Sequence, residues 1–140
     1  MLAVFWYFYC WKNTVNGTWY GTYELLRKIA AGGMAEVHLA RRWGDSGFYR
    51  EMVVKRLFQQ YAHNPASLVL FQYEARVMAE LTHPNIPQIF DLGECEDTWY
   101  IAMEYVPGST LRPFCRSDNL LPLEVVVEIG FKCAMALDYA

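Results

Sequence analysis

Two charged residues occupy positions where the surrounding pattern predicts apolar side chains. Lys55 follows Met52-Val53-Val54 in a predicted strand, and Glu74 precedes Ala75 near the apolar face of a predicted helix. A buried ammonium or carboxylate group is costly without a partner of opposite charge, so each residue supplies what the other needs. We predict that Lys55 and Glu74 meet and that the ammonium group faces an anionic ligand. The alternative is an edge-strand lysine and a solvated helical glutamate.

A glycine-rich turn, Gly32-Gly33-Met34-Ala35, lies between two predicted strands. A turn without bulky side chains lets backbone N–H groups approach phosphate oxygens closely. This turn leads into a strand rather than a helix, which argues against a dinucleotide-binding fold, and the Gly-Lys-Ser/Thr of a P-loop is missing. By itself the turn is better explained as a plain hairpin, but together with Lys55 it indicates a phosphate-binding site.

The spacing of apolar residues predicts an α+β fold that brings these groups together. Strands are expected over residues 23–31, 36–43, 48–58, 86–92 and 98–105, forming a five-stranded antiparallel sheet. A helix is expected to begin at Asn64-Pro65, because asparagine caps helices and proline suits the first position, and to end at Thr82-His83-Pro84. The apolar face of this helix comprises Leu68, Phe71, Ala75, Met78 and Leu81. After a break at Pro107-Gly108-Ser109, a further helix is expected over residues 123–140.

Composition restricts the class of protein. The chain has 140 residues, 54% of them hydrophobic, which is enough for a core, and a net charge of −3 without a basic stripe. We therefore expect no nucleic-acid partner. The cysteines lack the spacing of a metal or redox pair, so we expect no metal site built from them, and free thiols in the cytoplasm. They are Cys10, Cys95, Cys115 and Cys133.

The first eleven residues are almost entirely apolar and aromatic, and residues 12–19 are predicted to be a linker. Eleven residues are too few to span a bilayer, which takes about 20. A charged start and a small-residue cleavage site, which a secretory signal requires, are also missing. The segment is interpreted as a tail without function. Contact with a membrane surface, contact with a partner and a mis-assigned start codon are the alternatives.

Taken in order, these features resemble the protein kinases, and most of all the serine/threonine kinases of bacteria. Residues 29–37 resemble the Gly-rich loop, Met52-Val53-Val54-Lys55 the strand that carries the phosphate-binding lysine, and Glu74 its helical partner. His83-Pro84-Asn85-Ile86 resembles the turn after that helix, and residues 100–106 the fifth strand and hinge. The resemblance divides the chain into a tail and linker (1–19), an N-lobe with hinge (20–106) and the start of a C-lobe (107–140).

The resemblance implies phosphoryl transfer from Mg·ATP to the hydroxyl groups of a protein substrate that the sequence does not name. Lys55 would hold the phosphates, and Glu74 would orient Lys55. The Gly-rich loop would comprise Ile29, Ala30, Ala31, Gly32, Gly33, Met34 and Ala35. Met103 would be the gatekeeper, and backbone groups of Glu104 and Val106 would bond the adenine. The adenine ring would lie between Val37 and Val53, and Met78 and Ile89 would join the packed spine; all four would equally suit an ordinary core.

Two departures from the family pattern bear on function. Ala30 and Ala35 replace the first and third loop glycines, so the loop would sit further from the phosphates or move less freely, with Ala35 the milder change. The catalytic loop and the Mg²⁺ ligand motif are not found, so the catalytic base and metal ligands are expected beyond residue 140. We therefore expect the ATP-binding portion of a kinase that is inactive by itself. The alternative is a non-catalytic, kinase-like regulatory module that binds a nucleotide or a partner.

Overall fold

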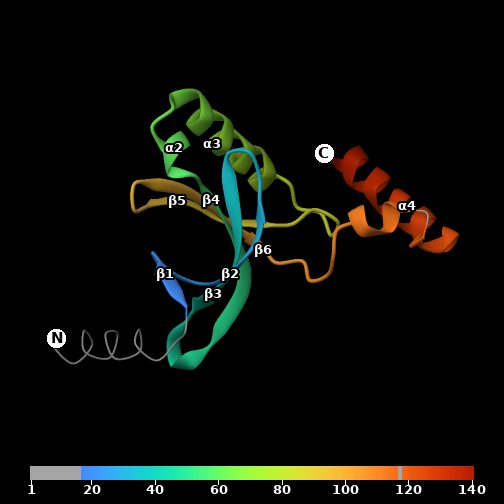
Figure 1. Ribbon diagram of the computed structural model, residues 1–140, viewed down its shortest axis with the longest axis horizontal. Helices are drawn as coiled ribbons and strands as arrows, with labels where there is room; N and C mark the ends of the chain where they lie inside the picture. Colours follow the sequence, from blue (N-terminus) through green and yellow to red (C-terminus); the bar gives the residue numbers. More distant parts are fainter. Residues whose placement is uncertain (1–16, 117) are drawn as a thin grey trace.

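A computed structural model describes residues 17–116 and 118–140 of the chain (Figure 1). The apolar segment at residues 1–11 and most of the expected linker lie outside the described residues. The chain forms a curled antiparallel sheet, one long helix that packs on the sheet, and a second long helix set apart from it (Figure 1). This arrangement agrees with the α+β class expected from the sequence.

The sheet has six strands rather than the five that were expected. They are β1 (Thr18–Tyr20), β2 (Tyr23–Ala31), β3 (Ala35–Trp43), β4 (Tyr49–Leu57), β5 (Ile89–Cys95) and β6 (Thr98–Glu104). Their order in the sheet is β1-β2-β3-β4-β6-β5, and every neighbouring pair is antiparallel. The additional strand is β1, so residues 18 and 19 belong to the sheet and not to a linker. It was missed because three residues are too few to show a strand period.

The fifth strand begins and ends later than the predicted range of residues 86–92. β5 runs from Ile89 to Cys95, and the turn to β6 is formed by Glu96 and Asp97, whose φ angles are 52° and 57°. Gly93 falls between the predicted strands 86–92 and 98–105, where a turn was expected, but it lies within β5, opposite Tyr100. A Cβ atom at Gly93 would lie 2.7 Å from the Tyr100 hydroxyl oxygen, so the glycine provides space for a ring and does not form the turn.

The long helix α3 (Pro65–Glu80) follows a short helix, α2 (Gln59–Ala62), that was not predicted. Asn64 caps α3 as expected, because its side-chain oxygen accepts hydrogen bonds from the N–H groups of Ala66 (3.0 Å) and Ser67 (3.2 Å). Phe71 and Ala75, two members of the predicted apolar face, are fully buried. These two side chains fasten α3 to the sheet.

Two apolar clusters fill the two faces of the sheet, as alternating strand side chains require. The first consists of Tyr20, Tyr23, Leu25, Ala40, Met52, Val54 and Ala102. The second lies between the sheet and α3 and consists of Ala35, Leu57, Phe71, Ala75 and Ile101. Because Phe71 and Ala75 belong to the second cluster, α3 covers the sheet face toward which Lys55 points.

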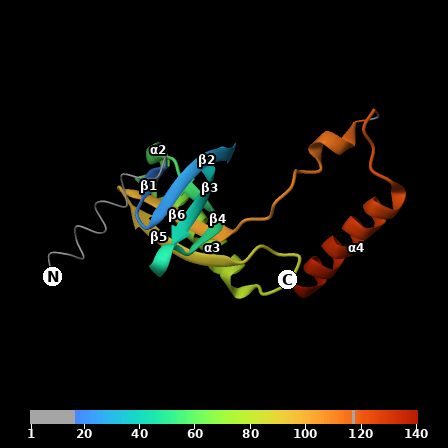
Figure 2. The same ribbon diagram turned by 90° about the horizontal axis from the view of Figure 1, so that it is seen from below.

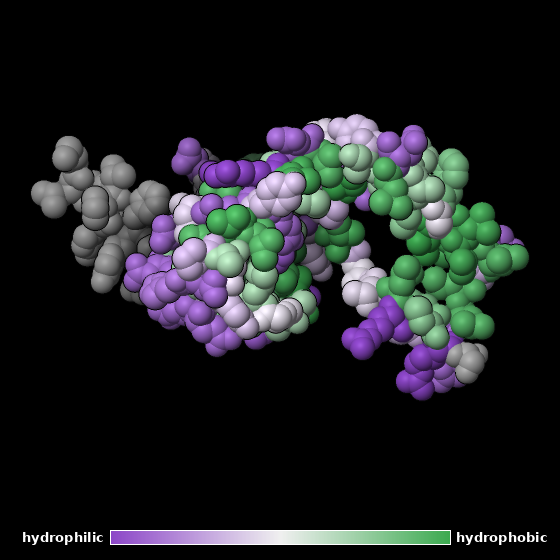
Figure 3. Space-filling view, turned by 90° about the horizontal axis from the view of Figure 1, so that it is seen from above, coloured by the Kyte–Doolittle hydropathy of each residue, from purple (hydrophilic) through white to green (hydrophobic). Residues whose placement is uncertain are grey.

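The last helix, α4 (Leu123–Tyr139), stands away from the sheet at the end of an extended connection (Figure 2). It touches the loop after α3 at two hydrogen bonds, from the Thr82 N–H to the Tyr139 hydroxyl oxygen (3.1 Å) and from the Asn85 side-chain amide to the Lys132 carbonyl oxygen (3.2 Å). Apolar side chains cover much of its exposed surface (Figure 3). Among the described residues, no helix combines the length and the apolar character needed to cross a membrane.

Candidate nucleotide-binding site

Lys55 and Glu74 are in direct contact, as predicted. The Lys55 ammonium nitrogen donates to both carboxylate oxygens of Glu74, at 2.6 and 2.8 Å. The strand β4 supplies the lysine and the middle of α3 supplies the glutamate, three residues after the buried Phe71. The ammonium nitrogen also lies 5.7 Å from the centre of the Phe71 ring. Packing of α3 against the sheet therefore determines where the two charges meet.

The ion pair is more exposed than the sequence argument assumed. The Lys55 side chain is 21% exposed and the Glu74 side chain 50% exposed. At this exposure an ion pair contributes at most about 1 kcal/mol to stability. The pair therefore contributes little to stability, and the lysine remains partly accessible to solvent.

The glycine turn joins β2 to β3 and is closed by one hydrogen bond, from the Gly32 N–H to the Ala35 carbonyl oxygen (2.8 Å). Neither glycine has a φ angle in the left-handed region. A Cβ atom at Gly33 would meet no other atom within 4 Å, and one at Gly32 would be in ordinary contact at 3.7 Å. The fold therefore does not require glycine at either position, and the absent side chains leave the turn open to a ligand.

Ala35, which replaces the third glycine of the loop pattern, is 4% exposed and packs in the cluster with Leu57 and Phe71. Its methyl group therefore points into the core and not over the turn. Met34 packs against the same cluster, and its carbonyl oxygen accepts a hydrogen bond from the Phe58 N–H (2.9 Å). Ala35 therefore does not push the loop away from a ligand by steric contact. Ala30, at the end of β2, is exposed.

The other predicted binding residues line the same face of the sheet. Val37 is paired with Lys55, and Val53 with both Leu39 and Met103, in adjacent strands. Val53 is buried, and Val37 is half-buried. The face therefore offers apolar side chains beside the ammonium group, an arrangement that suits a flat aromatic base.

The predicted hinge residues follow at the end of β6. The Glu104 N–H donates to the Gln88 carbonyl oxygen at 2.8 Å, so a base at the hinge would meet the Glu104 carbonyl oxygen rather than its N–H. Val106 is exposed, just beyond the strand. Ile89 and Met103 pack against the cluster that contains Phe71, and Met78 is half-buried on α3.

Two surface hollows lie elsewhere on the molecule. One, of about 440 Å³, is found at the β3–β4 hairpin and is lined in part by Trp43, Tyr49 and Phe90. The other, of about 300 Å³, lies between α3 and β5 beside Ala79. Lys55 and the glycine turn line neither of them. The proposed site is therefore separate from these two hollows: it lies where Lys55 of β4 meets Glu74 of α3.

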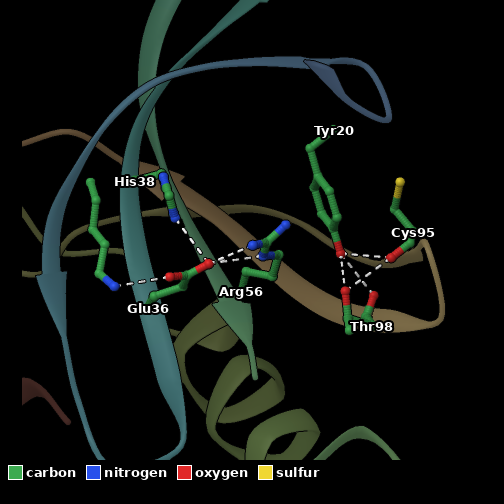
Figure 4. Close-up of polar contacts among 7 residues, drawn as sticks. Tyr20, Glu36, His38, Arg56, Cys95 and Thr98 are labelled. Carbon is green, nitrogen blue, oxygen red and sulfur yellow. Dashed lines mark hydrogen bonds and ion pairs between the residues drawn. The ribbon is translucent and has the colours of Figure 1, made fainter. Parts of the chain in front are cut away.

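A second charged cluster near the turn was missed by the sequence argument (Figure 4). Glu36, the second residue of β3, receives hydrogen bonds at one carboxylate oxygen from Arg56 Nε (3.1 Å) and Nη2 (2.5 Å). Lys28 Nζ lies 3.1 Å from the other oxygen, and His38 Nε2 lies 3.2 Å from the first, without hydrogen-bond alignment. The charged residues are visible in the sequence, but only the strand register brings them together.

Burial and charge act in opposite directions on Glu36, whose side chain is 12% exposed. Burial alone would raise the pKa of its carboxyl group. Hydrogen bonds from Arg56 and Lys28 outweigh that effect and lower the pKa from 4.5 to about 2. Glu36 is therefore a carboxylate at every pH at which the protein would function.

The resemblance to protein kinases implies Mg²⁺, which prefers oxygen ligands. Over residues 17–116 and 118–140, no three side chains of His, Cys, Asp or Glu gather as metal ligands. The residues present therefore do not fit Mg²⁺ as its primary ligands.

Comparison with known proteins agrees with this geometry. The family model described as protein tyrosine and serine/threonine kinase matches residues 23–140. The tyrosine-protein kinase MasK of Myxococcus xanthus is 44% identical over 125 residues, which cover 86% of this chain and 19% of that protein. The serine/threonine-protein kinases PknB of Mycobacterium leprae and PrkC of Bacillus subtilis are each 38% identical, covering 84% and 86% of this chain.

A crystal structure of the Mycobacterium tuberculosis PknI kinase domain superimposes with a TM-score of 0.68 and 31% identity, over 89% of this chain and 49% of that one. The chain thus belongs to the protein kinase family and contains the N-lobe with the start of the C-lobe. It spans about a fifth of the length of the curated relatives it matches (19%, 19% and 18% for the three proteins above).

Proposed function

We propose that this chain is the ATP-binding portion of a protein kinase that transfers a phosphoryl group from ATP to protein hydroxyl groups. The observation that carries the proposal is the contact of the Lys55 ammonium group with Glu74, on the sheet face that the glycine turn borders. In this arrangement Lys55 donates to phosphate oxygens while Glu74 fixes its position. Open space at Gly33 lets backbone N–H groups approach the same phosphates.

The residues present fit ATP. Val37 and Val53 would supply apolar contact for the base, and the Glu104 carbonyl oxygen would accept a hydrogen bond from it, since the Glu104 N–H is already bonded to Gln88. Transfer in this family also needs Mg²⁺, which neutralises charge on the phosphates. We expect the ligands of Mg²⁺ and the catalytic base outside the described residues. This chain contributes the positioning of the nucleotide.

A titration of the purified chain with ATP and with adenosine tests nucleotide binding. Lys55→Met is expected to weaken ATP binding about ten- to a hundredfold, because a hydrogen bond to a charged group contributes about 1.5–3 kcal/mol. Adenosine binding should not change. Lys132→Met is the matched control, because Lys132 also pairs with a glutamate, Glu128, at 2.7 Å but lies on α4. Equal affinity of the native chain for ATP and adenosine would contradict the proposal.

Gly33→Ala provides a second test of the same site. The new methyl group would meet no protein atom, so the stability of the chain should be unchanged. ATP binding should nevertheless weaken, because the methyl group would occupy space that a phosphate group needs. Unchanged ATP affinity in a normally folded variant would mean that the turn does not approach the ligand.

The acceptor is proposed to be serine or threonine, because PknB and PrkC are serine/threonine kinases by name. The relationship to MasK, a tyrosine-protein kinase, makes tyrosine the second candidate. Analysis of phosphorylated amino acids, in a longer protein that contains this chain, distinguishes the two. In that protein Lys55→Met is expected to abolish phosphoryl transfer.

The compartment is proposed to be the cytoplasm, where ATP is available. The three described cysteines, Cys95, Cys115 and Cys133, are unpaired, which supports a reducing environment.

A further inference from the structure

Glu36 connects the two segments that the proposed site places around the phosphates. Its backbone pairs with Ala31 of β2 and with Arg56 of β4, so it stands between the strand before the glycine turn and the strand that carries Lys55. Its side chain joins the same two strands a second time, through Lys28 of β2 and Arg56. Arg56 directly follows Lys55 in the chain.

The cluster lies behind the site and not within it. Successive side chains of a strand point to opposite faces of the sheet. Lys55 and Val37 are cross-strand partners on one face, and Glu36 and Arg56 are partners on the other. Glu36 is therefore unsuited to touching a nucleotide on the Lys55 face. It acts on the position of the backbone that carries the binding groups.

Within the glycine turn, Gly32 and Gly33 carry no side chains, whereas Met34 and Ala35 pack in the cluster with Leu57 and Phe71. One hydrogen bond closes the turn, and Met34 anchors its far side to Phe58. The position of Gly32 and Gly33 relative to Lys55 therefore depends on how firmly the ends of β2 and β3 are held. Arg56 and Lys28 make charge-assisted contacts with one carboxylate that is only 12% exposed, and such contacts are stronger than neutral hydrogen bonds, so they restrain the strand ends on either side of the turn.

We propose that Glu36 is a positioning residue that holds the glycine turn at a fixed separation from Lys55, so that both bind the same phosphate groups. This role rests on the proposed nucleotide-binding function. It predicts that losing the Glu36 charge weakens the phosphate part of nucleotide binding and leaves the adenosine part intact. A purely structural role predicts lower stability with both ligands affected equally.

Glu36→Gln in the full 140-residue chain separates these roles, because glutamine keeps the shape of the side chain and removes its charge. We expect ATP binding to weaken about tenfold and adenosine binding to stay within about twofold, the loss typical of a binding group that is held too loosely. Glu51→Gln is the matched control. Glu51 pairs with Arg41 across the same two strands at 3.4 Å, far from the turn. An equal loss for both ligands, or no loss for either, overturns the role of Glu36.

Hydrogen exchange provides a readout that does not depend on nucleotide. Glu36→Gln is expected to speed amide exchange about tenfold at residues 31–35, with no comparable change in α3. Uniform acceleration, or none at the turn, overturns the proposal even if the chain binds no nucleotide. If the native chain binds ATP and adenosine equally well while Glu36→Gln still speeds exchange at the turn, the proposed function fails, and what remains is only that Glu36 restrains the turn. Should Glu36→Gln not fold, Lys28→Met removes the most exposed member of the cluster, and the same two measurements apply.

Discussion

Removing one hydroxyl group from Tyr20 tests whether β1 is an integral part of the sheet. The Tyr20 ring is 1% exposed, and its hydroxyl oxygen lies 2.7 Å from the Cys95 carbonyl oxygen, 3.0 Å from the Thr98 carbonyl oxygen and 2.6 Å from Thr98 Oγ1 (Figure 4). Tyr20→Phe deletes all three contacts and retains the ring. The variant therefore isolates the polar attachment of β1 to the turn between β5 and β6.

The expected loss of stability depends on which hydrogen-bonding groups keep a partner in Tyr20→Phe. Thr98 Oγ1 still donates to the Cys95 carbonyl oxygen at 3.0 Å, so both of those groups keep a partner. The main loss is the hydrogen bond that the phenol itself donates. We therefore expect Tyr20→Phe to lower the free energy of unfolding by about 1–2 kcal/mol, toward the lower end of the range for a buried group left unpaired.

Urea denaturation followed by circular dichroism measures this change. With a slope of about 2 kcal/mol per molar urea, the midpoint should fall by about 0.5–1 M. Tyr73→Phe is the control, because Tyr73 is an exposed tyrosine of α3, and it should leave the midpoint unchanged. The double variant of Tyr20→Phe with Thr98→Val should lose less than the sum of the two single losses, since both substitutions remove the same contact.

A midpoint for Tyr20→Phe equal to that of the native chain would refute this reasoning. It would mean that β1 does not dock on the sheet in solution. Strict additivity with Thr98→Val would refute the narrower claim that the two hydroxyl groups interact.

Three further outcomes are expected from unfolding measurements. The lowered pKa of Glu36 stabilises the chain by about 2 kcal/mol after solvent screening. This contribution is complete above pH 4.5 and is lost as pH falls toward 2. The free energy of unfolding of Glu36→Gln should therefore equal that of the native chain near pH 2. Gly93→Ala should cost about 1–3 kcal/mol, because the new methyl group displaces the Tyr100 ring, whose hydroxyl donates to Asp91 at 2.9 Å; an unchanged melting temperature would contradict this. Asn64→Ala should cost about 1 kcal/mol, and Asn64→Asp, which can still cap α3, should cost clearly less.

The sequence predicted those helices and strands that are determined by neighbouring residues, such as a helix cap, a short turn or an alternating pattern. The start of α3 at Pro65 follows from the cap at Asn64, and the strands β2 to β4 follow from alternation and short turns. β1 could not be predicted in this way, because the contact that holds it joins Tyr20 to Thr98, 78 residues later. Gly93 was misassigned because a glycine that makes room for a ring and a glycine that forms a turn look alike in sequence.

The candidate site was only partly predictable for the same reason. Lys55 and Glu74 were found because an unpaired charge in an apolar pattern demands a partner, and the structure supplies that partner. Their exposure was not foreseen, since it depends on how closely α3 approaches the sheet. The residues around Glu36, in contrast, do not appear as unpaired charges within an apolar sequence pattern. They become neighbours only when β2, β3 and β4 are aligned in register.

The buried Phe71 ring links the rotation of α3 to the position of the Glu74 carboxylate. The ring is completely buried, and Glu74 lies three residues later, on nearly the same side of the helix. Turning the helix by one residue, about 100°, to withdraw the carboxylate would also expose the ring to water, at a cost of about 2–3 kcal/mol. A rotation of α3 that withdraws the Glu74 carboxylate from Lys55 would therefore also unseat the Phe71 ring, so the ion pair and the buried aromatic contact would be lost together.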